Sequence, residues 1–339
     1  MVRRPDADAL PFPVLLGDIG GTNARFCLLS RPNDAPADII QVRTADYDSI
    51  DRALAEKVLP VFSQSPRSAI LAIAAPVKGA EVTLTNCSWV IRPKRMITDL
   101  GLRNVILLND FEAQALAAAS LSPADLEPVG ALDQPGDSTR IVLGPGTGLG
   151  VAGLLKANGT WIPIAGEGGH VDIGSRSARD HEIFPHLERI DGRVSAEEIL
   201  SGRGLVNLYK AICRADGLDG VSATAAEISE HGLSGENRQA AEAIRLFVTY
   251  LGRLAGDLAL TFMARGGVFV AGGISPKIIS AFRTADFREA FEDKAPHRAL
   301  MQTIPTFVIT HPQAALVGLA SYASAPRVFS LELEHRTWQ

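Results

Sequence analysis

The chain of 339 residues contains only three cysteines, Cys27, Cys87 and Cys213. They lie far apart, form no CxxC pair and are odd in number. The sequence therefore lacks both the spacing of a structural zinc site and the even cysteine count of a disulfide framework. We expect a reducing compartment and a cytoplasmic protein.

Basic runs and long apolar runs are also missing. The formal net charge is −5 and the pI is near 5.8, so the chain lacks the positive surface that binds nucleic acid or an anionic membrane. Two arginines stand near the N-terminus, but acids and prolines interrupt the residues that follow, which disfavours a secretory leader. We expect a small-molecule ligand, no nucleic acid partner and no membrane span.

Apolar residues make up 46% of the chain, enough to bury a sizeable core. Two segments repeat a pattern of strand, glycine turn and strand: LLGDIGGTNARF at residues 15–26 and RIVLGPGTGLGVAGLL at residues 140–155. Neither turn carries the lysine that a Walker-type phosphate loop requires, which excludes a P-loop. The repeat predicts a duplicated α/β architecture.

Other segments fit the same fold class. Residues 67–77 and 104–110 have the pattern of buried strands, and residues 111–121 form an alanine-rich helix. Residues 195–212 predict two helices with a Ser-Gly break between them, and residues 240–263 predict a long helix. A third glycine turn, Gly272-Gly273, follows a strand and precedes a helix, with Ser275 as its expected N-cap and Pro276 at its first position.

Polar residues at these junctions have two interpretations. Asp110 follows a buried strand, and ligands meet an α/β sheet at the carboxyl ends of its strands. Asn109 or Asp110 could equally cap the following helix by accepting hydrogen bonds from its first amides. The glycine turns taken singly could be tight hairpins, and Glu197 taken alone could be a capping-box glutamate.

Six segments decide between these interpretations when they are taken together. GDIGGTNARF, LLNDFEAQALA, GPGTGLGVAGL, GEGGHVDIG, VSAEEILSGRGLVNLYKAI and GGVFVAGGISP occur in this order from residue 17 to residue 276. The set resembles the bacterial glucokinases of the hexokinase group over nearly the whole chain. The first dozen residues and the tail after about residue 328 are least covered.

The resemblance implies a two-domain α/β fold of the actin-like ATPase, ribonuclease H-like type, with mixed sheets and a cleft between the domains. The small domain would comprise residues 1–120 and 311–339, and the large domain residues 121–310. The implied activity is ATP-dependent phosphorylation of glucose at the 6-hydroxyl to give glucose 6-phosphate. A homodimer is also implied.

The same resemblance implies roles for individual residues. Asp110 would accept the proton of the glucose 6-hydroxyl, and Asn109 would hold an adjacent hydroxyl. Glu167, His170 and Glu197 would bind the sugar, since carboxylates accept hydrogen bonds from paired hydroxyls and an imidazole can donate or accept. Glu198, next to Glu197, is expected to point elsewhere.

The nucleotide would lie on the glycine turns, with Mg²⁺ in place of the missing lysine. Asp18 would sit near the metal, because Mg²⁺ needs only one or two carboxylates in addition to phosphates and water. The expected contacts with the phosphates and the adenosine are Gly20, Gly21, Thr22, Asn23, Gly144, Gly146, Thr147, Gly148, Gly272 and Gly273.

Three other hypotheses remain at this point, one of them a catalytically silent sugar-binding protein, which the presence of both Asp110 and Asp18 disfavours. A sugar kinase of the ROK branch usually carries a cysteine cluster after the GH histidine, and the stretch GHVDIGSRSARDHEIF has no cysteine. An actin-like or chaperone-type ATPase shares the glycine hairpins but has no need of Glu167, His170 and Glu197. The glycine turns do not fix the donor among ATP, ADP and polyphosphate.

Overall fold

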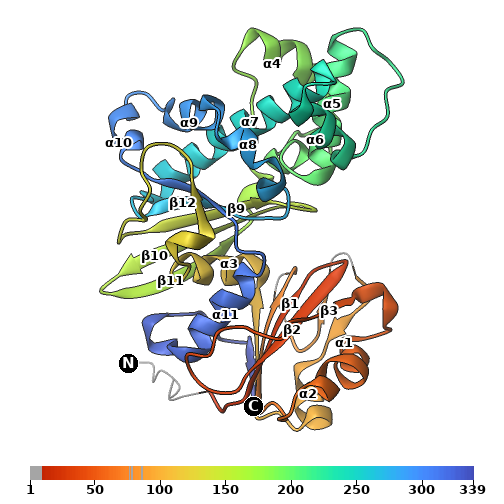
Figure 1. Ribbon diagram of the computed structural model, residues 1–339, viewed down its shortest axis with the longest axis vertical. Helices are drawn as coiled ribbons and strands as arrows, with labels where there is room; N and C mark the ends of the chain where they lie inside the picture. The colour runs from red at the N-terminus through yellow and green to blue at the C-terminus, as the bar shows by residue number, and fades with distance from the viewer. Residues whose placement is uncertain (1–9, 76, 78, 85–86) are drawn as a thin grey trace. The chain divides into compact units, whose positions relative to one another are not determined.

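The computed structural model describes residues 10–75, 77, 79–84 and 87–339 (Figure 1). Residues 1–9 of the N-terminal stretch used to argue against a leader lie outside this range, as does residue 76 of the expected strand 67–77. By its internal contacts the chain divides into two units. The first is Met1–Leu121, Leu154–Ala165 and Pro312–Gln339, and the second is Ser122–Gly153 and Gly166–His311. No helix in the described residues has the length and apolarity needed to cross a membrane.

The first unit is built on a six-stranded sheet in the order β14-β7-β4-β1-β2-β3. Its strands are β1 Val14–Ile19, β2 Asn23–Leu29, β3 Ile40–Arg43, β4 Ser68–Ile73, β7 Asn104–Asn109 and β14 Thr337–Trp338, beside a small pair β5 Val82–Thr83 and β6 Val90–Ile91. Its helices are α1 Ile50–Ala53, α2 Pro93–Leu100, α3 Asp110–Ala118 and α11 Ala314–Ser324.

The burial of the strands agrees with their apolar sequences. β4 is buried along its whole length, as expected of a central strand covered on both faces. β1 pairs antiparallel with β2 and parallel with β4, and β4 pairs parallel with β7. Helices α3 and α11 pack against each other and contact β4, and a separate core forms where α1 and α2 meet the sheet (Figure 1).

The second unit contains the sheet β11-β10-β9-β12-β13-β8, although the outer half of the β10–β11 hairpin is grouped with the first unit. Its strands are β8 Leu126–Pro128, β9 Arg140–Pro145, β10 Leu149–Ala157, β11 Thr160–Gly166, β12 Gly267–Val270 and β13 Thr306–Ile309. Its helices are α4 Ala178–Ile183, α5 Gly202–Ala215, α6 Ala225–Ser234, α7 Arg238–Phe262, α8 Ile279–Phe282, α9 Ala285–Glu292 and α10 Arg298–Gln302.

The long helix α7 is the centre of this unit's helical layer. It packs against α5, α6 and α9 and reaches the sheet at β9 and β12 (Figure 1). Fourteen of its residues are buried, in agreement with the long helix predicted over residues 240–263.

The duplicated architecture predicted from the glycine turns is confirmed by strand order. The series β3-β2-β1-β4-β7 in one sheet has the same form as β11-β10-β9-β12-β13 in the other. In each, the last three strands run parallel and an antiparallel strand, β14 or β8, is added at the edge. The fold is therefore a mixed α/β fold with two related halves.

Two local predictions were wrong. The first predicted helix in residues 195–212 is only a 3₁₀ turn, η7 Ala196–Glu198, before α5 begins. Ser275 is not an N-cap: it is the first residue of the 3₁₀ turn η8 Ser275–Ile278, and its buried hydroxyl donates to the Ala271 carbonyl at 3.1 Å. Ser275 lies inside the turn, and the N-cap position is taken by Ile274, with no side-chain capping hydrogen bond.

Candidate active site

The first glycine turn connects β1 to β2. The Gly20 amide donates to the Asn23 carbonyl at 3.0 Å, which closes a tight turn around Gly21 and Thr22. Thr22 is exposed at its tip. The backbone of this turn is therefore fixed while its outer side is open to a ligand.

Thr44, the residue after strand β3, forms two hydrogen bonds to this turn. Its hydroxyl donates to the Gly21 carbonyl at 2.7 Å, and its amide donates to the Thr22 carbonyl at 3.0 Å. Thr44 is buried, with 4% of its surface exposed. No local pattern predicts this contact, because a threonine just after a four-residue strand carries no motif.

Asp18 faces a cation that sequence analysis also missed. Asp18 on β1 pairs in register with Arg25 on β2, and Arg25 Nη1 lies 3.5 Å from Asp18 Oδ2. Burial raises the pKa of Asp18 above its ordinary value, and the Arg25 guanidinium opposes this shift. The period-two alternation of a hairpin places these side chains on one face.

This carboxylate fits a metal ion that arrives with a nucleotide. About a fifth of the Asp18 side chain is exposed, and the described residues contain no cluster of three or more potential metal ligands. Such a donor set does not form an all-protein cage. It suits Mg²⁺, which takes one or two carboxylates and fills its other positions with phosphate oxygens and water.

The register of the parallel strands brings Asp18 to the same sheet edge as Asn109. Asp18 pairs with Ala72 of β4, which pairs with Leu108 of β7, the residue before Asn109. Neighbouring strands are about 4.8 Å apart, so β1 and β7 are separated by about 10 Å. Asp18 and the Asn109-Asp110 pair therefore lie at the carboxyl ends of parallel strands of the same sheet.

Asn109 and Asp110 also form the N-terminus of α3. The Phe111 amide donates to Asn109 Oδ1 at 2.9 Å and to Asp110 Oδ1 at 3.0 Å. The capping role considered from the sequence is thus present in the structure. It does not exclude a chemical role, because a carboxylate has two oxygens and about four acceptor positions.

A buried ion pair fixes this N-terminus. Glu112 Oε2 accepts a hydrogen bond from the backbone amide of Asn109 at 2.9 Å and another from Arg336 Nη1 at 2.6 Å. The Glu112 side chain is 3% exposed and that of Arg336 is 14% exposed. Arg336 immediately precedes β14, and its carbonyl accepts from the Leu107 amide at 3.0 Å. No local pattern predicts this pair, since its partners are 224 positions apart.

The second glycine turn follows β9 and is held by Glu197. Glu197 Oε2 accepts from the Leu149 amide at 2.7 Å, just after the turn. A Cβ on Gly148 would come within 2.5 Å of the same oxygen, so a larger residue here would displace the Glu197 carboxylate. The Gly202 amide at the start of α5 donates to the Gly146 carbonyl at 2.9 Å, and Thr147 at the tip is exposed.

The GEGGH segment lies beside the same group. His170 Nε2 is 3.8 Å from Glu167 Oε2, and both side chains are more than half exposed. The Ala196 amide donates to the Val171 carbonyl at 2.9 Å, which joins this segment to the residues before Glu197. The second unit therefore brings Glu167, His170 and Glu197 into one region.

Glu198 points away from this group, as expected, but it is not solvated. It is 2% exposed and forms an ion pair with Arg203 of α5. The neighbouring Asn207 donates to the Glu198 carbonyl at 2.9 Å. Glu197 thus binds the backbone of the glycine turn, whereas the adjacent Glu198 binds Arg203 of helix α5.

The third glycine turn contacts the second. Gly272 has φ of +83°, and a Cβ there would collide with the Pro145 carbonyl oxygen. The Ile274 amide donates to the same carbonyl at 3.3 Å. A Cβ on Gly273 would meet nothing within 4 Å, so Gly273 leaves open space where a ligand could approach.

The predicted residues therefore form two groups, one in each unit. Asp18, Gly20, Gly21, Thr22, Asn23, Asn109 and Asp110 belong to the first unit, and Gly144, Gly146, Thr147, Gly148, Glu167, His170, Glu197, Gly272 and Gly273 to the second. Each group combines glycine turns with carboxylate or amide side chains, as phosphate and sugar hydroxyls require.

Comparison of the sequence and the structure with known proteins finds glucokinases in each case. The sequence model of the glucokinase family matches residues 15–326. The chain is 58% identical to a glucokinase of Agrobacterium fabrum over 339 residues, which is all of both chains. A crystal structure of glucokinase from an Antarctic psychrotroph has a TM-score of 0.82 at 31% identity, covering 91% of this chain and 98% of that one.

A more distant structure shares the fold. A glucokinase of Balamuthia mandrillaris, crystallised in complex with glucose, has a TM-score of 0.75 at 23% identity and covers 92% of this chain and 93% of its own.

Proposed function

The chain belongs to the glucokinase family, and from this premise we propose that it transfers the γ-phosphoryl group of ATP to the 6-hydroxyl of glucose. The observation that carries the chemistry is the position of Asp110, a carboxylate at the carboxyl end of a parallel strand and the first residue of a helix. Ligands of α/β sheets bind at such strand ends.

Asp110 would act as the base for the sugar hydroxyl. Its Oδ1 already accepts from the Phe111 amide, which orients the carboxylate, while its second oxygen would accept the 6-hydroxyl proton as the oxygen attacks phosphorus. The transition state of phosphoryl transfer is loose, so positioning of the hydroxyl contributes more than proton removal. The Glu112–Arg336 pair supports this geometry from behind the helix terminus.

The sugar would be bound by Asn109, Glu167, His170 and Glu197. Asn109 Oδ1 is used by the Phe111 amide, which leaves its amide nitrogen to donate to a hydroxyl next to the reacting one. Glu197 Oε2 is used by the Leu149 amide, so its Oε1 would face the sugar. Glu167 and His170 are exposed and 3.8 Å apart, which suits two adjacent hydroxyls.

The nucleotide would lie along the glycine turns, with its phosphates at the turns of residues 20–23 and 144–148 and its adenosine toward Gly272 and Gly273. Mg²⁺, with Asp18 as its protein carboxylate, would neutralise charge on the phosphates when bound. Backbone amides of the turns that are not used within them would donate to phosphate oxygens, and the glycines would let these amides approach closely.

We also propose the domain division drawn from the sequence, with residues 1–120 and 311–339 as the small domain and residues 121–310 as the large one. A homodimer in the cytoplasm with no nucleic acid partner completes the proposal. Sedimentation equilibrium at several protein concentrations would test the dimer, and a single species of 36.0 kDa would contradict it.

One assay tests the function. The protein is mixed with Mg²⁺, glucose and ATP, ADP or polyphosphate in turn, and the sugar 6-phosphate formed is measured by a coupled dehydrogenase. Mannose, fructose and glucosamine replace glucose in parallel reactions. We expect product with ATP and glucose. Sugar-independent ATP hydrolysis at a comparable rate would instead favour an actin-like or chaperone-type ATPase.

A further inference from the structure

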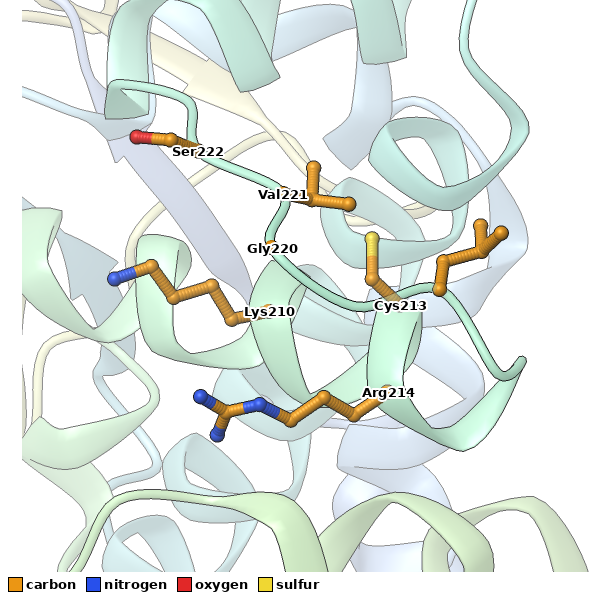
Figure 2. Close-up of a pocket in the computed structure, with 7 residues that line it drawn as sticks. Lys210, Cys213, Arg214, Gly220, Val221 and Ser222 are labelled. Carbon is orange, nitrogen blue, oxygen red and sulfur yellow. The ribbon is translucent and has the colours of Figure 1, made fainter.

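A cavity of about 220 Å³ lies between the last turns of α5 and the loop that follows this helix (Figure 2). Its walls come from Lys210, Cys213 and Arg214 on α5 and from Leu218, Gly220, Val221 and Ser222 on the loop. None of these residues belongs to the glycine turns, the sugar-binding group or Asp110. The cavity is therefore separate from the proposed active site.

Its polar groups lie on one side. Figure 2 shows Lys210 and Arg214, one helical turn apart, extending in the same direction, with the Ser222 hydroxyl directed to that side as well. Leu218, Val221 and the Cys213 thiol supply the apolar part of the wall. A ligand that fits these walls has an anionic end and a short carbon skeleton.

The positive charge at this site is not neutralised by the protein. Lys210 is half-buried, and no described residue forms an ion pair or hydrogen bond with its ammonium group. Within the part of the chain that the structure describes, the exposed Arg214 donates only to the His186 carbonyl, at 3.4 Å. Asp216, the nearest acid along the chain, is bound by Arg179 at 2.8 Å and by Gln239 at 2.9 Å.

Lys210 differs in this respect from several other buried or half-buried cations of the second unit, which are paired. Arg253 binds Asp180 at 2.7 Å, and Lys294 binds Asp257 at 2.6 Å. Two unpaired cations side by side repel each other and gain most from a ligand with two or more anionic oxygens. A phosphoryl group has this charge and geometry.

We propose that this cavity binds a small phosphomonoester. Its phosphoryl oxygens accept from Lys210, Arg214 and the Ser222 hydroxyl, and its carbon skeleton lies against Leu218 and Val221. This site is additional to the active site and does not depend on the residue roles proposed there.

The test is calorimetric titration of the full chain with glycerol 3-phosphate. Glucose and a non-hydrolysable ATP analogue are present at saturation so that the active site is occupied, and ionic strength is held constant with chloride. We expect saturable binding with Kd of about 1 mM or tighter. Glycerol, which lacks the phosphoryl group, should give no heat of binding.

Substitutions test whether the heat of binding comes from this cavity. Lys210→Met with Arg214→Met should weaken binding at least tenfold, whereas Lys210→Arg should retain it. The matched control, Lys57→Met with Arg103→Met, removes the same two charges from exposed positions and should bind as the parent does. Absence of saturable binding in the parent, or equal binding in the Lys210→Met, Arg214→Met variant with an unchanged thermal midpoint, would overturn the proposal.

Discussion

Replacing Arg336 by methionine removes one member of the buried pair at the N-terminus of α3. Glu112 would then keep a 3% exposed carboxylate with only the Asn109 amide as donor. Breaking a buried ion pair on one side costs about 3–5 kcal/mol, and the partial exposure of Arg336 lowers our expectation to roughly 2–4 kcal/mol of unfolding free energy. Denaturant unfolding measures this loss.

The same change should also slow catalysis. Glu112 holds the Asn109 amide, and a charge left without its partner is expected to shift the first turn of α3 and the Asp110 carboxylate with it. A misplacement of about 1 Å can cost on the order of 100-fold in rate. We expect kcat for glucose phosphorylation to fall by roughly 10- to 100-fold at temperatures where the variant remains folded, with the KM for ATP little changed.

The second unit offers a matched control. Arg253 and Asp180 form a pair with similar exposure, 14% and 0%, away from the residues assigned to the reaction. Arg253→Met should lose less stability than Arg336→Met, because Asp180 keeps donors from Arg176, Ser177 and Tyr250, and it should keep its kcat. If both variants lose kcat in proportion to their stability, or if Arg336→Met keeps full turnover, the positioning role of the Glu112–Arg336 pair is wrong.

Three further predictions concern single residues. Burial tends to raise the pKa of Asp180, but hydrogen bonds from side chains and backbone amides outweigh burial and lower this pKa below 3.8. The ionised carboxylate therefore stabilises the fold above about pH 4, and this stabilisation is lost as the pH falls. The unfolding free energy of Asp180→Asn should depend less steeply on pH in the acid range, and an unchanged slope would contradict this. Burial raises the pKa of the Cys27 thiol to about 12, so iodoacetamide at pH 8 should leave Cys27 unmodified in the native protein, as peptide mass spectrometry can show. Gly148→Ala should raise the KM for glucose several-fold by displacing Glu197, whereas Gly174→Ala, where a Cβ meets nothing within 4 Å, should not, and equal KM values would refute the contact.

Local signals predicted much of the fold. The glycine pair between two apolar runs predicted the β1–β2 hairpin, and the apolar run before Asn109 predicted β7 and the helix after it, since both depend on adjacent residues. The duplicated strand order followed from the recurrence of the turn. Parallel pairing then placed Asp18 and Asn109 at one sheet edge.

Contacts between distant residues could not be predicted in this way. Thr44 supports the first turn from 23 positions away and Arg336 supports α3 from 224 positions away, and neither has a local pattern. Ser275 was misassigned because the turn begins one residue earlier than expected, with Ile274 at its N-cap. The burial of Glu198 depends on Arg203, which the pattern SAEE does not specify.

The central claim, that Asp110 is the base for sugar phosphorylation, is tested most directly by Asp110→Asn. The amide oxygen can still accept from the Phe111 amide, so the helix terminus should remain folded. We predict that kcat with ATP and glucose falls by roughly 10²- to 10⁴-fold, while the calorimetric Kd for glucose stays close to that of the parent protein. Turnover near the parent value in a folded variant would contradict the account.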